Sequence, residues 1–334
     1  MKAGIIGTGS YVPDKRVTNE DMAVLVETTD DWIVSRTGIR QRRFSDGEST
    51  WHMAERAALA ALENAGCSAS ELDLIIVSTV TPDYFTPSIS CILQGRLKAA
   101  RAFAFDINAA CSGFIYGLDI ARRYVEAGAA KKALLVCSET LTKITDFTDR
   151  NTCVLFGDGA GAVVIGATEG PGIMETYLAS DGTGASLLVS KALAAINPVC
   201  PEPAPDILDA RSDRFIHMDG KEVYKFAVRA MPEAIDKVLA KGGLRIDEVS
   251  HILPHQANAR IIESVVEKYG LDPSKVLVTL DKYGNTSSSS IPIGLDELNR
   301  SGGLRQGQLL LAVGFGAGLT YGSALIRWQE ANHA

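Results

Sequence analysis

The sequence predicts an α/β protein, a layered α/β/α/β/α sandwich built from two duplicated βα halves that are related by pseudo-symmetry. Three observations predict this fold class: a long internal repeat, strands that are apolar on both faces, and Ala/Leu-rich helices that alternate with those strands. A sheet made of such strands needs a helix layer on each face. Two such units packed together therefore give five layers.

The internal repeat has an offset of 177 residues and holds at three separate places. Its core aligns NAACSGFIYGLD, which starts at Asn108, with NTSSSSIPIGLD, which starts at Asn285. The same offset aligns ELDLII at 71–76 with EVSHIL at 248–253, and ALLVC at 133–137 with LLAVG downstream. Three matches in one register indicate a duplicated unit.

Each half is expected to contain the same run of elements. An Ala/Leu-rich helix that ends at a glycine is followed by a strand, a helix after the Asn motif, an apolar strand and a Gly-rich strand. These elements fall at 52–65, 74–80, 111–127, 133–138 and 157–166 in the first half, and at 222–241, 250–254, 287–300, 308–313 and 316–327 in the second. A strand-like run precedes the first Asn motif, and a further helix is expected at 259–269.

We divide the chain into two halves, 1–170 and 218–334, joined by an inserted connection at 171–217. The Pro-rich part of this connection, 182–217, has no counterpart elsewhere in the repeat, and neither does the segment 139–154. Insertions on a duplicated scaffold are where function tends to lie, so both segments are candidates for a functional role.

The composition is that of an ordinary folded protein and excludes several classes of function. Of 334 residues, 46% are apolar and 22% are charged, and the net charge of −7 argues against a general nucleic-acid binder. No run of 18 apolar residues occurs and no signal-peptide core is present, so we expect a cytoplasmic protein without a membrane span. The six cysteines show no CxxC pair and no ligand spacing, which predicts free thiols and no metal site.

Three residues near the ends of predicted strands can carry chemistry. Cys111 stands between a strand-like run and a helix, where helix N–H groups and the helix dipole favour a thiolate, and its small neighbours leave room for a substrate. His255 ends a strand, and Pro254 excludes a helical metal pair with His251. Together with Asn285, the thiol and imidazole form a set of nucleophile, base and oxyanion donor. By residue type alone, the alternatives are a core cysteine, a structural histidine and an asparagine in a turn.

Two glycine motifs and one serine motif do not fit the functions that they suggest. Gly7-Thr-Gly9 is followed by Pro13 and not by a helix, and GDGAGA at 157–162 continues as a strand. A dinucleotide fingerprint needs a strand, a turn and a helix in that order. Ser112 lacks the GxSxG elbow of a serine hydrolase. The sequence therefore predicts neither a Rossmann nucleotide site nor a serine hydrolase.

At these residues the chain resembles the β-ketoacyl-acyl-carrier-protein synthase III family, the initiating condensing enzymes of type II fatty-acid synthesis in the thiolase-like superfamily. The resemblance covers nearly the whole length. It rests on seven motifs in order, which are GTGSY from Gly7, DWIVSRTGIR from Asp31, AACSG from Ala109, FGDGAG from Phe156, PHQAN from Pro254, GNTS from Gly284 and GFGAGLTYG from Gly314.

The resemblance implies a thiolase-like fold and a two-step reaction that uses no cofactor, with acyl-CoA as a substrate. A starter acyl-CoA would acylate Cys111. Malonyl-acyl carrier protein would then lose CO₂, with His255 and Asn285 stabilising the enolate, and the carbanion would attack the thioester. Backbone N–H groups of Cys111 and Ala317 would hold the tetrahedral oxyanion. The family often has glycine at the second position, so alanine there would be strained if a positive φ were required.

The resemblance also implies binding residues for coenzyme A. Trp32 and Arg150 would sandwich the adenine, an arrangement suited to a planar base and a guanidinium. Thr28, Arg36 and Asn258 would contact the rest of the molecule.

Carrier-protein docking and the starter pocket are also assigned by resemblance. Lys225 and Arg260 would form a basic patch that receives the acidic carrier protein, and the enzyme would be a homodimer. A bulky Phe often precedes a proline and narrows the starter pocket from the partner subunit, whereas here Thr86 precedes Pro87. We therefore expect starters larger than acetyl.

Two other interpretations stay open. A specialised relative in polyketide, quinolone or other secondary metabolism would keep the same Cys, His and Asn and differ in starter and extender. A non-enzymatic scaffold that only binds a carrier protein would be expected to lose at least one of the three residues, and all three are present.

Overall fold

The computed structural model describes residues 2–193, 199, 208 and 214–329. Its main strands are β1 (Lys2–Tyr11), β4 (Leu74–Ser78), β5 (Phe103–Ile107), β6 (Lys132–Glu139), β7 (Gly159–Thr168), β8 (Ile173–Ser180), β11 (His251–Pro254), β12 (Leu309–Gly316) and β13 (Thr320–Arg327). They form one sheet in the order β1-β7-β6-β4-β5 and a second in the order β11-β12-β13-β8. Two small antiparallel sheets of two strands pair β2 (Arg16–Thr18) with β3 (Gln41–Arg43), and β9 (Leu188–Ser190) with β10 (Ile216–Met218).

The two large sheets have the same pattern of strand directions. In the first, β5, β4 and β6 run parallel, and β7 and β1 are added antiparallel. In the second, β11 and β12 run parallel, and β13 and β8 are added antiparallel. Val276 forms an isolated parallel bridge to Ile252 at the edge where the first sheet has β5. The duplication read from the sequence is therefore a duplication of the whole sheet.

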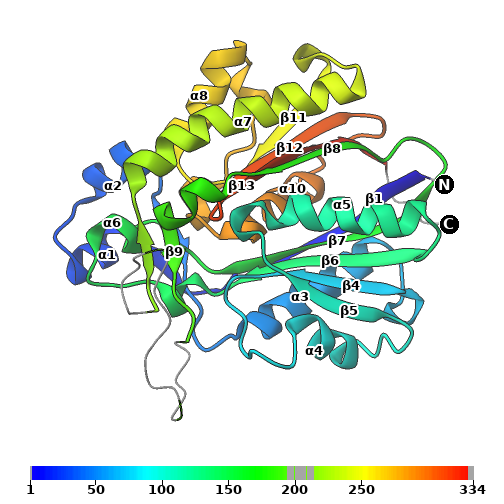
Figure 1. Cartoon of the computed structure of the whole chain (residues 1–334), viewed down its shortest axis with the longest axis horizontal. Helices are drawn as coiled ribbons and strands as arrows, with labels where there is room; N and C mark the ends of the chain where they lie inside the picture. The colour runs from blue at the N-terminus through cyan, green and yellow to red at the C-terminus, as the bar shows by residue number, and fades with distance from the viewer. Residues whose placement is uncertain (1, 194–198, 200–207, 209–213, 330–334) are drawn as a thin grey trace.

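Helices form three layers around these sheets (Figure 1). The middle layer is α5 (Gly113–Glu126) with α10 (Ser290–Arg300); the outer layers are α3 (Thr50–Asn64) with α4 (Ile89–Arg96), and α7 (Gly220–Gly242) with α8 (Ala259–Tyr269). The peripheral helices are α1 (Asn19–Leu25), α2 (Asp30–Thr37), α6 (Arg150–Cys153) and α9 (Leu280–Tyr283). This arrangement confirms the five-layer sandwich predicted from the sequence. Within the described part of the chain, no helix has both the length and the apolar character needed to cross a membrane.

The largest apolar cluster lies between the two sheets and draws on both halves. Leu74 and Phe114 from the first half pack in it with Leu295 and Leu310 from the second, and all four are fully buried. Burying apolar surface contributes about 25 cal/mol per Å². The two halves therefore share one apolar core.

The 177-residue offset holds to the residue around the functional motifs. The 3₁₀ turns Ala110–Ser112 and Ser287–Ser289 occupy equivalent positions, and each begins with a non-glycine residue in the left-handed region, at φ 44° and 52°. Such a conformation is uncommon for residues with a side chain, so both turns are held in place by the surrounding structure. The segment 139–154 accounts for the shorter offset between β7 and β13.

Two buried carboxylates fasten the middle-layer helices to edge strands. Asp119 on α5 accepts a hydrogen bond from Thr176 of β8 at 2.5 Å. Asp296 on α10 accepts hydrogen bonds from Thr8 and Ser10 of β1 at 2.7 and 2.6 Å. These aspartates are themselves 177 residues apart, and each helix binds the edge strand of the opposite sheet.

Two predicted boundaries need correction. β8 lies inside the segment 171–217, yet it pairs with β13 and completes the second sheet, so the second half begins before residue 218. Helix α7 begins at Gly220, earlier than predicted, because the Asp219 carboxylate accepts the Glu222 N–H and caps the helix. Of the Pro-rich excursion, residues 194–198, 200–207 and 209–213 lie outside the described residues.

Candidate active site

A cavity of about 1650 Å³ is lined by residues of both halves, and Cys111, His255 and Asn285 all face it. The three come from the turn after β5, the end of β11 and the turn before α10. The structure thus brings together the thiol, the imidazole and the amide that the sequence singled out. Other lining residues include Trp32, Arg36, Asn108, Leu141, Phe156, Ile216, Asn258, Phe315 and Ala317.

Cys111 lies in the 3₁₀ turn that joins β5 to α5. The backbone of Gly316 packs directly against this turn, since a Cβ added there would lie 2.6 Å from the Cys111 nitrogen and 3.1 Å from the Ala110 Cβ. The Cys111 Sγ donates a hydrogen bond to the Ser287 Oγ at 3.4 Å. Glycine at 316 therefore allows the second half to approach the nucleophile closely.

The thiolate expected from the helix N-terminus is not the resting state. Burial raises the pKa of Cys111 to about 12, the hydrogen bond with Ser287 opposes part of the rise, and the negative Glu139 carboxylate adds to it. Loss of hydration disfavours the anion, and here it outweighs the helix dipole. The residue is therefore a thiol until substrate arrives, and its proton must leave during acylation.

His255 presents an N–H donor to the cavity. Its backbone N–H donates to the Val313 carbonyl at 2.8 Å, and its Nδ1 lies 2.8 Å from the Ser290 Oγ. That Oγ also accepts the Gln256 N–H at 3.4 Å, and we assign the serine proton to Nδ1, which places the ring's own proton on Nε2. Burial lowers the pKa of His255 to about 3, so the ring is a neutral hydrogen-bond donor at neutral pH.

Asn285 is oriented by backbone hydrogen bonds on both sides. Its N–H donates to the Leu155 carbonyl at 2.9 Å, and its carbonyl accepts the Gly157 N–H at 3.0 Å. Its side-chain Oδ1 accepts the Ser287 N–H at 2.8 Å. With the carbonyl oxygen occupied in this way, the Nδ2 amide is left as the donor for a ligand.

A buried arginine that the sequence analysis did not single out supports the Asn285 loop. Arg42 is fully buried and donates to the Val154 carbonyl at 2.8 Å. Its side chain packs against Gly157 and Gly284, where added Cβ atoms would lie 3.3 and 3.2 Å from its Cβ. Burial lowers the pKa of Arg42 to about 10, which leaves it charged at neutral pH.

The second predicted oxyanion donor, Ala317, follows β12 and lines the same cavity. Since Gly316 contacts the Cys111 nitrogen, the backbone around Ala317 lies beside the nucleophile. Among the described non-glycine residues, a positive φ occurs at Lys98, Ala110 and Ser287. The strain considered for alanine at position 317 therefore does not arise.

The predicted adenine site is closed in this structure. The Arg150 guanidinium lies over the Trp32 ring at 4.9 Å from its centroid, and it donates to the Glu27 carbonyl at 3.0 Å. A base between the two planes would need them about 7 Å apart, two van der Waals layers. Arg36 lines the cavity, whereas Thr28 does not and keeps a buried hydroxyl without a protein partner.

The other predicted binding residues have structural contacts as well. Asn258 caps α8 by accepting the Arg260 N–H at 2.9 Å and donates to the Arg36 carbonyl at 3.0 Å. Arg260 is exposed and donates to the Ser35 carbonyl at 3.0 Å. Lys225 is exposed on α7 and pairs with a glutamate one turn away. The first turns of both helices reach the cavity, through residues 220, 221, 223 and 224 of α7 and residues 258 and 261 at the start of α8, whereas Lys225 and Arg260 do not line it.

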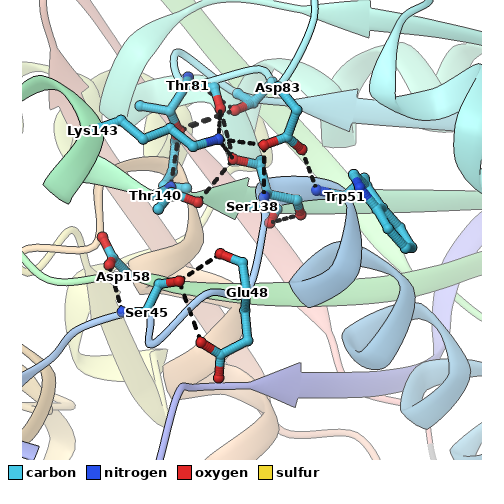
Figure 2. Close-up of polar contacts among 12 residues, drawn as sticks. Ser45, Glu48, Trp51, Thr81, Asp83, Ser138, Thr140, Lys143 and Asp158 are labelled. Atoms are coloured by element: carbon cyan, nitrogen blue, oxygen red, sulfur yellow. Dashed lines mark hydrogen bonds and ion pairs between the residues drawn. The ribbon is translucent and has the colours of Figure 1, made fainter. Parts of the chain in front are cut away.

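Thr86, the predicted pocket gate, is exposed on the single chain and does not line the cavity. The segment that carries it is anchored by the polar network in Figure 2. Asp83 accepts the Thr50 and Trp51 N–H groups at 3.1 and 2.8 Å, which caps α3, and it is ion-paired with Lys143. The segment 139–154 is thereby tied to the loop that follows β4.

Glu139, at the end of β6, is a buried carboxylate that sequence reasoning missed. It accepts hydrogen bonds from the Ser288 hydroxyl at 2.7 Å, the Thr81 hydroxyl at 2.9 Å and the Val80 N–H at 3.0 Å. Burial raises its pKa, and hydrogen bonds, including one from Ser287, oppose part of the rise. The signal in the sequence was an acidic residue directly after a fully apolar strand. In the described residues no group of three or more His, Cys, Asp or Glu side chains is placed to hold a metal ion.

The duplicated halves and the shared Cys/His/Asn site define a thiolase-like condensing enzyme. Comparisons with known proteins agree. The family model for 3-oxoacyl-[acyl-carrier-protein] synthase III matches residues 105–182, and the model for its C-terminal part matches residues 239–328. A Clostridium tetani protein named β-ketoacyl-[acyl-carrier-protein] synthase III is 48% identical, over 97% of this chain and 98% of its own.

Solved structures give the same result. The 3-oxoacyl-[acyl-carrier-protein] synthase III of Aquifex aeolicus is 44% identical, with a TM-score of 0.89 over 98% of this chain and 100% of its own. The priming β-ketosynthase of the R1128 polyketide pathway is 36% identical, with a TM-score of 0.88 over 99% and 97%. The chain belongs to the β-ketoacyl-[acyl-carrier-protein] synthase III family and is an acyltransferase of the condensing type.

Proposed function

We propose that this enzyme condenses a starter acyl-CoA with malonyl-acyl carrier protein to give a 3-oxoacyl-acyl carrier protein, the step that initiates fatty-acid synthesis. The observation that carries the proposal is that one cavity holds a thiol, an imidazole N–H and an amide donor. These are the groups that such a reaction needs as nucleophile and as enolate donors.

In the first half-reaction the Cys111 sulfur attacks the acyl carbon of the acyl-CoA. A new C–S bond forms, the bond to the CoA sulfur breaks, and the Cys111 proton is released. The tetrahedral oxyanion is met by the N–H groups of Cys111 and Ala317. The first N–H groups of a helical turn have no intrahelical partner, so they are available to such an oxygen.

In the second half-reaction malonyl-acyl carrier protein loses CO₂. The electron pair left behind spreads onto the thioester oxygen, and the Nε2–H of His255 and the Nδ2–H of Asn285 donate to that oxygen. The carbanion then attacks the acyl group, and the Cys111 sulfur leaves and regains a proton. Neutral donors already aimed at the site stabilise the developing charge without reorganising, typically by 10²–10³-fold in rate per donor.

Coenzyme A binding at Trp32 and Arg36 is part of the same proposal. Arg150 must leave the Trp32 ring before an adenine can stack there. Lys225 and Arg260, on helices whose first turns border the cavity, are placed to receive an acidic carrier protein.

We also propose that the starter is larger than acetyl. An apolar cluster of Leu141, Phe156 and Ile216 borders the cavity, joined by further apolar side chains at residues 80, 144, 155 and 188. A longer acyl chain would bury additional surface against this cluster. We expect octanoyl-CoA or a branched acyl-CoA to exceed acetyl-CoA in kcat/KM by about tenfold or more. A profile limited to acetyl-CoA would refute this part of the proposal.

A homodimer is a further part of the proposal, and it would place the Thr86 segment of one chain near the pocket of the other. β5 is an edge strand, and the Phe103 side chain on it is 43% exposed. Phe85, beside Thr86, is 79% exposed. Exposed edges and apolar patches of this kind mark association surfaces. Light scattering should give twice the chain mass. We propose a cytoplasmic location, in keeping with its proposed substrates.

A role in secondary metabolism is the second candidate. The similarity to the priming β-ketosynthase of the R1128 polyketide pathway supports it. The two candidates differ in the starter and in the carrier protein that delivers the extender. Assaying one acyl-CoA panel with the host's fatty-acid carrier protein separates them. Condensation with that carrier protein supports the primary role, and acylation without condensation supports the specialised one.

The central test is mass spectrometry after incubation with acyl-CoA thioesters. Wild-type protein should gain one acyl mass, and Cys111→Ala should gain none. His255→Ala and Asn285→Ala should still be acylated but should lose condensation by about 10²-fold or more, because they act on the enolate. If no CoA thioester leaves an adduct on the wild type, the proposed mechanism is wrong.

A further inference from the structure

Glu139 is a fully buried carboxylate beside the nucleophile, and the reaction outlined above gives it no task. Its hydrogen bonds come from hydroxyl groups and a backbone N–H, and no lysine or arginine of the described residues forms an ion pair with it. Burying a carboxylate without a cation is costly. The position of this group therefore calls for a functional reason.

The Ser287 hydroxyl lies between this carboxylate and the catalytic thiol. It accepts the Cys111 S–H at 3.4 Å, and it also lowers the pKa of the Glu139 carboxyl, to which Ser288, the next residue of the same turn, donates at 2.7 Å. A hydroxyl has one proton to donate. Since Ser287 accepts from the thiol, its own proton is free to point to Glu139. The turn that carries Ser287 and Ser288 therefore contacts both the sulfur and the carboxylate.

We propose that Glu139 takes the Cys111 proton through Ser287 as the thiol attacks the acyl-CoA, and returns it when the thiolate leaves. The inference rests on the proposed function, because it concerns the acylation of Cys111. Ser287 contacts the reacting sulfur and is the catalytic residue of the pair. Glu139 acts through Ser287, and it holds the proton until the thiolate leaves.

The proton and electron balance closes over the two half-reactions. During acylation the Cys111 S–H bond breaks, its proton passes to the Ser287 oxygen, and the Ser287 proton passes to Glu139. The electron pair of the broken thioester bond leaves on the CoA sulfur, which is protonated by water. During condensation the carbanion displaces the Cys111 thiolate, and Glu139 returns the proton by the same path. No oxidant, reductant or further reactant is needed.

The electrostatics of the site favour such an exchange. Burial raises the pKa of Cys111 and of Glu139, so each group resists being the anion. The relay requires Glu139 to be ionised before acylation, and moving the thiol proton to it then leaves the total charge of the site unchanged, whereas sending that proton to water would leave two adjacent anions. The other titratable groups around the pair are buried and neutral: Cys137, whose pKa burial raises, and His255, whose pKa burial lowers.

The internal repeat also sets these residues apart. Position 139 corresponds to Gly316, position 287 to Ala110 and position 288 to Cys111. The thiol, the hydroxyl and the carboxylate are therefore all departures from the repeat, and they meet at one place. A purely structural contact between the halves would not require all three.

The test is single-turnover acylation of the full-length enzyme, followed by quenched mass spectrometry between pH 6 and pH 9 with one acyl-CoA that the wild type accepts. Ser287→Ala and Glu139→Gln should each slow acylation by about 100-fold at pH 7, a typical contribution of a positioned proton acceptor. In both variants the rate should then rise about tenfold per pH unit, since hydroxide must remove the proton. The wild-type profile should be nearly flat.

Ser289→Ala is the matched control. Ser289 lies in the same turn and donates to the Gly159 and Thr286 carbonyls at 2.9 and 2.7 Å, and the structure gives it no hydrogen bond to Cys111 or to Glu139. We expect its acylation rate to stay within about threefold of the wild type, with a flat pH profile. If Ser289→Ala is as slow as Ser287→Ala, loss of any hydroxyl of this turn disturbs the site and the relay is overturned.

The remaining outcomes separate the relay from the proposed function. An adduct that forms at the wild-type rate and pH profile in Ser287→Ala overturns the relay and leaves the acyltransferase function intact. Absence of an adduct in the wild type refutes the proposed function itself. If Glu139→Gln does not fold, the comparison of Ser287→Ala with Ser289→Ala decides.

Discussion

At the scale of single residues, the proposed enolate donors each have a serine as a hydrogen-bond partner. Ser290 Oγ bonds the Nδ1 of His255, and the Ser287 N–H orients the side-chain amide of Asn285. The sequence allowed us to predict that Cys111, His255 and Asn285 lie together, because the first two follow strands and the third begins the repeated Asn motif. It did not single out Ser287 or Ser290, because a run of serines after Gly-Asn is typical of a turn. It did not single out Glu139, because the burial of a carboxylate depends on tertiary packing.

The neutral state of His255 predicts a stability change with pH. Its folded pKa of about 3 lies below the unfolded value near 6.5, so below pH 6.5 the unfolded chain takes up a proton that the folded chain refuses. Between pH 7 and pH 5 the wild type should therefore lose about 2 kcal/mol of unfolding free energy relative to His255→Gln. Urea unfolding of both proteins at pH 7, 6 and 5 measures this. A difference that does not change with pH would mean that His255 titrates normally.

The close approach at Gly316 predicts a sharp effect of one methyl group. Gly316→Ala would place a Cβ 2.6 Å from the Cys111 nitrogen, so the turn that holds the nucleophile must shift. We expect about 2 kcal/mol of destabilisation and about 10²-fold slower acylation, because the oxyanion donors move. Gly95→Ala is the control, since nothing lies within 4 Å of its Cβ position and its φ is not positive. Both are checked by thermal unfolding and adduct formation; equal acylation rates would contradict the prediction.

At the scale of elements, predictions succeeded where a long periodic pattern existed. The helix expected at 259–269 is α8 with the same bounds, and the second apolar strand of each half was found at its place. The elements that were missed, such as α4, α6 and α9, are short. A helix of four to eight residues is not stable alone, so its formation depends on caps and tertiary contacts that no local pattern encodes.

Asp83 is one of these tertiary contacts, because it caps α3 from a distant loop and pairs with Lys143. Asp83→Ala should lower the free energy of unfolding by about 2–3 kcal/mol, since two backbone N–H groups at the α3 N-terminus and the Lys143 ammonium lose their acceptor. Asp83→Asn, which keeps an acceptor, should cost less. Glu55→Ala removes an ion pair with a 55% exposed arginine and should cost under about 1 kcal/mol. Urea midpoints rank the three variants, and an Asp83→Ala loss no larger than that of Glu55→Ala would contradict the cap.

At the scale of the whole molecule, the active site exists because two similar halves meet at equivalent turns and then differ. The repeat made the shared architecture predictable from the sequence, including the thiol in one half and the imidazole and amide in the other. It did not place β8 in the second sheet, since this strand lies in a segment without an aligned partner motif. The predicted sandwich of Arg150 and Trp32 around an adenine concerned a bound state, and the two side chains contact each other directly without ligand.

The hydrogen bonds between each middle-layer helix and the edge strand of the other sheet predict that the halves unfold together. Asp119 and Asp296 each join a middle-layer helix to the edge strand of the other sheet, so removing either carboxylate weakens the contact between halves. Asp296→Ala should lower the free energy of unfolding by about 3 kcal/mol and Asp119→Ala by about 2 kcal/mol, because the first change leaves the Thr8 and Ser10 hydroxyls without their acceptor and the second leaves only that of Thr176.

The matched controls for this pair remove only the solvent-facing arginines. Arg123 and Arg300 are 74% and 56% exposed and pair with Asp119 and Asp296, so Arg123→Ala and Arg300→Ala should each cost under about 1 kcal/mol. All four variants should keep a single unfolding transition by fluorescence and circular dichroism, because the core between the sheets draws on both halves. Two separate transitions in the wild type would show that the halves are independent domains. Equal losses in the aspartate and arginine variants would show that the hydroxyl bonds do not hold the layers together.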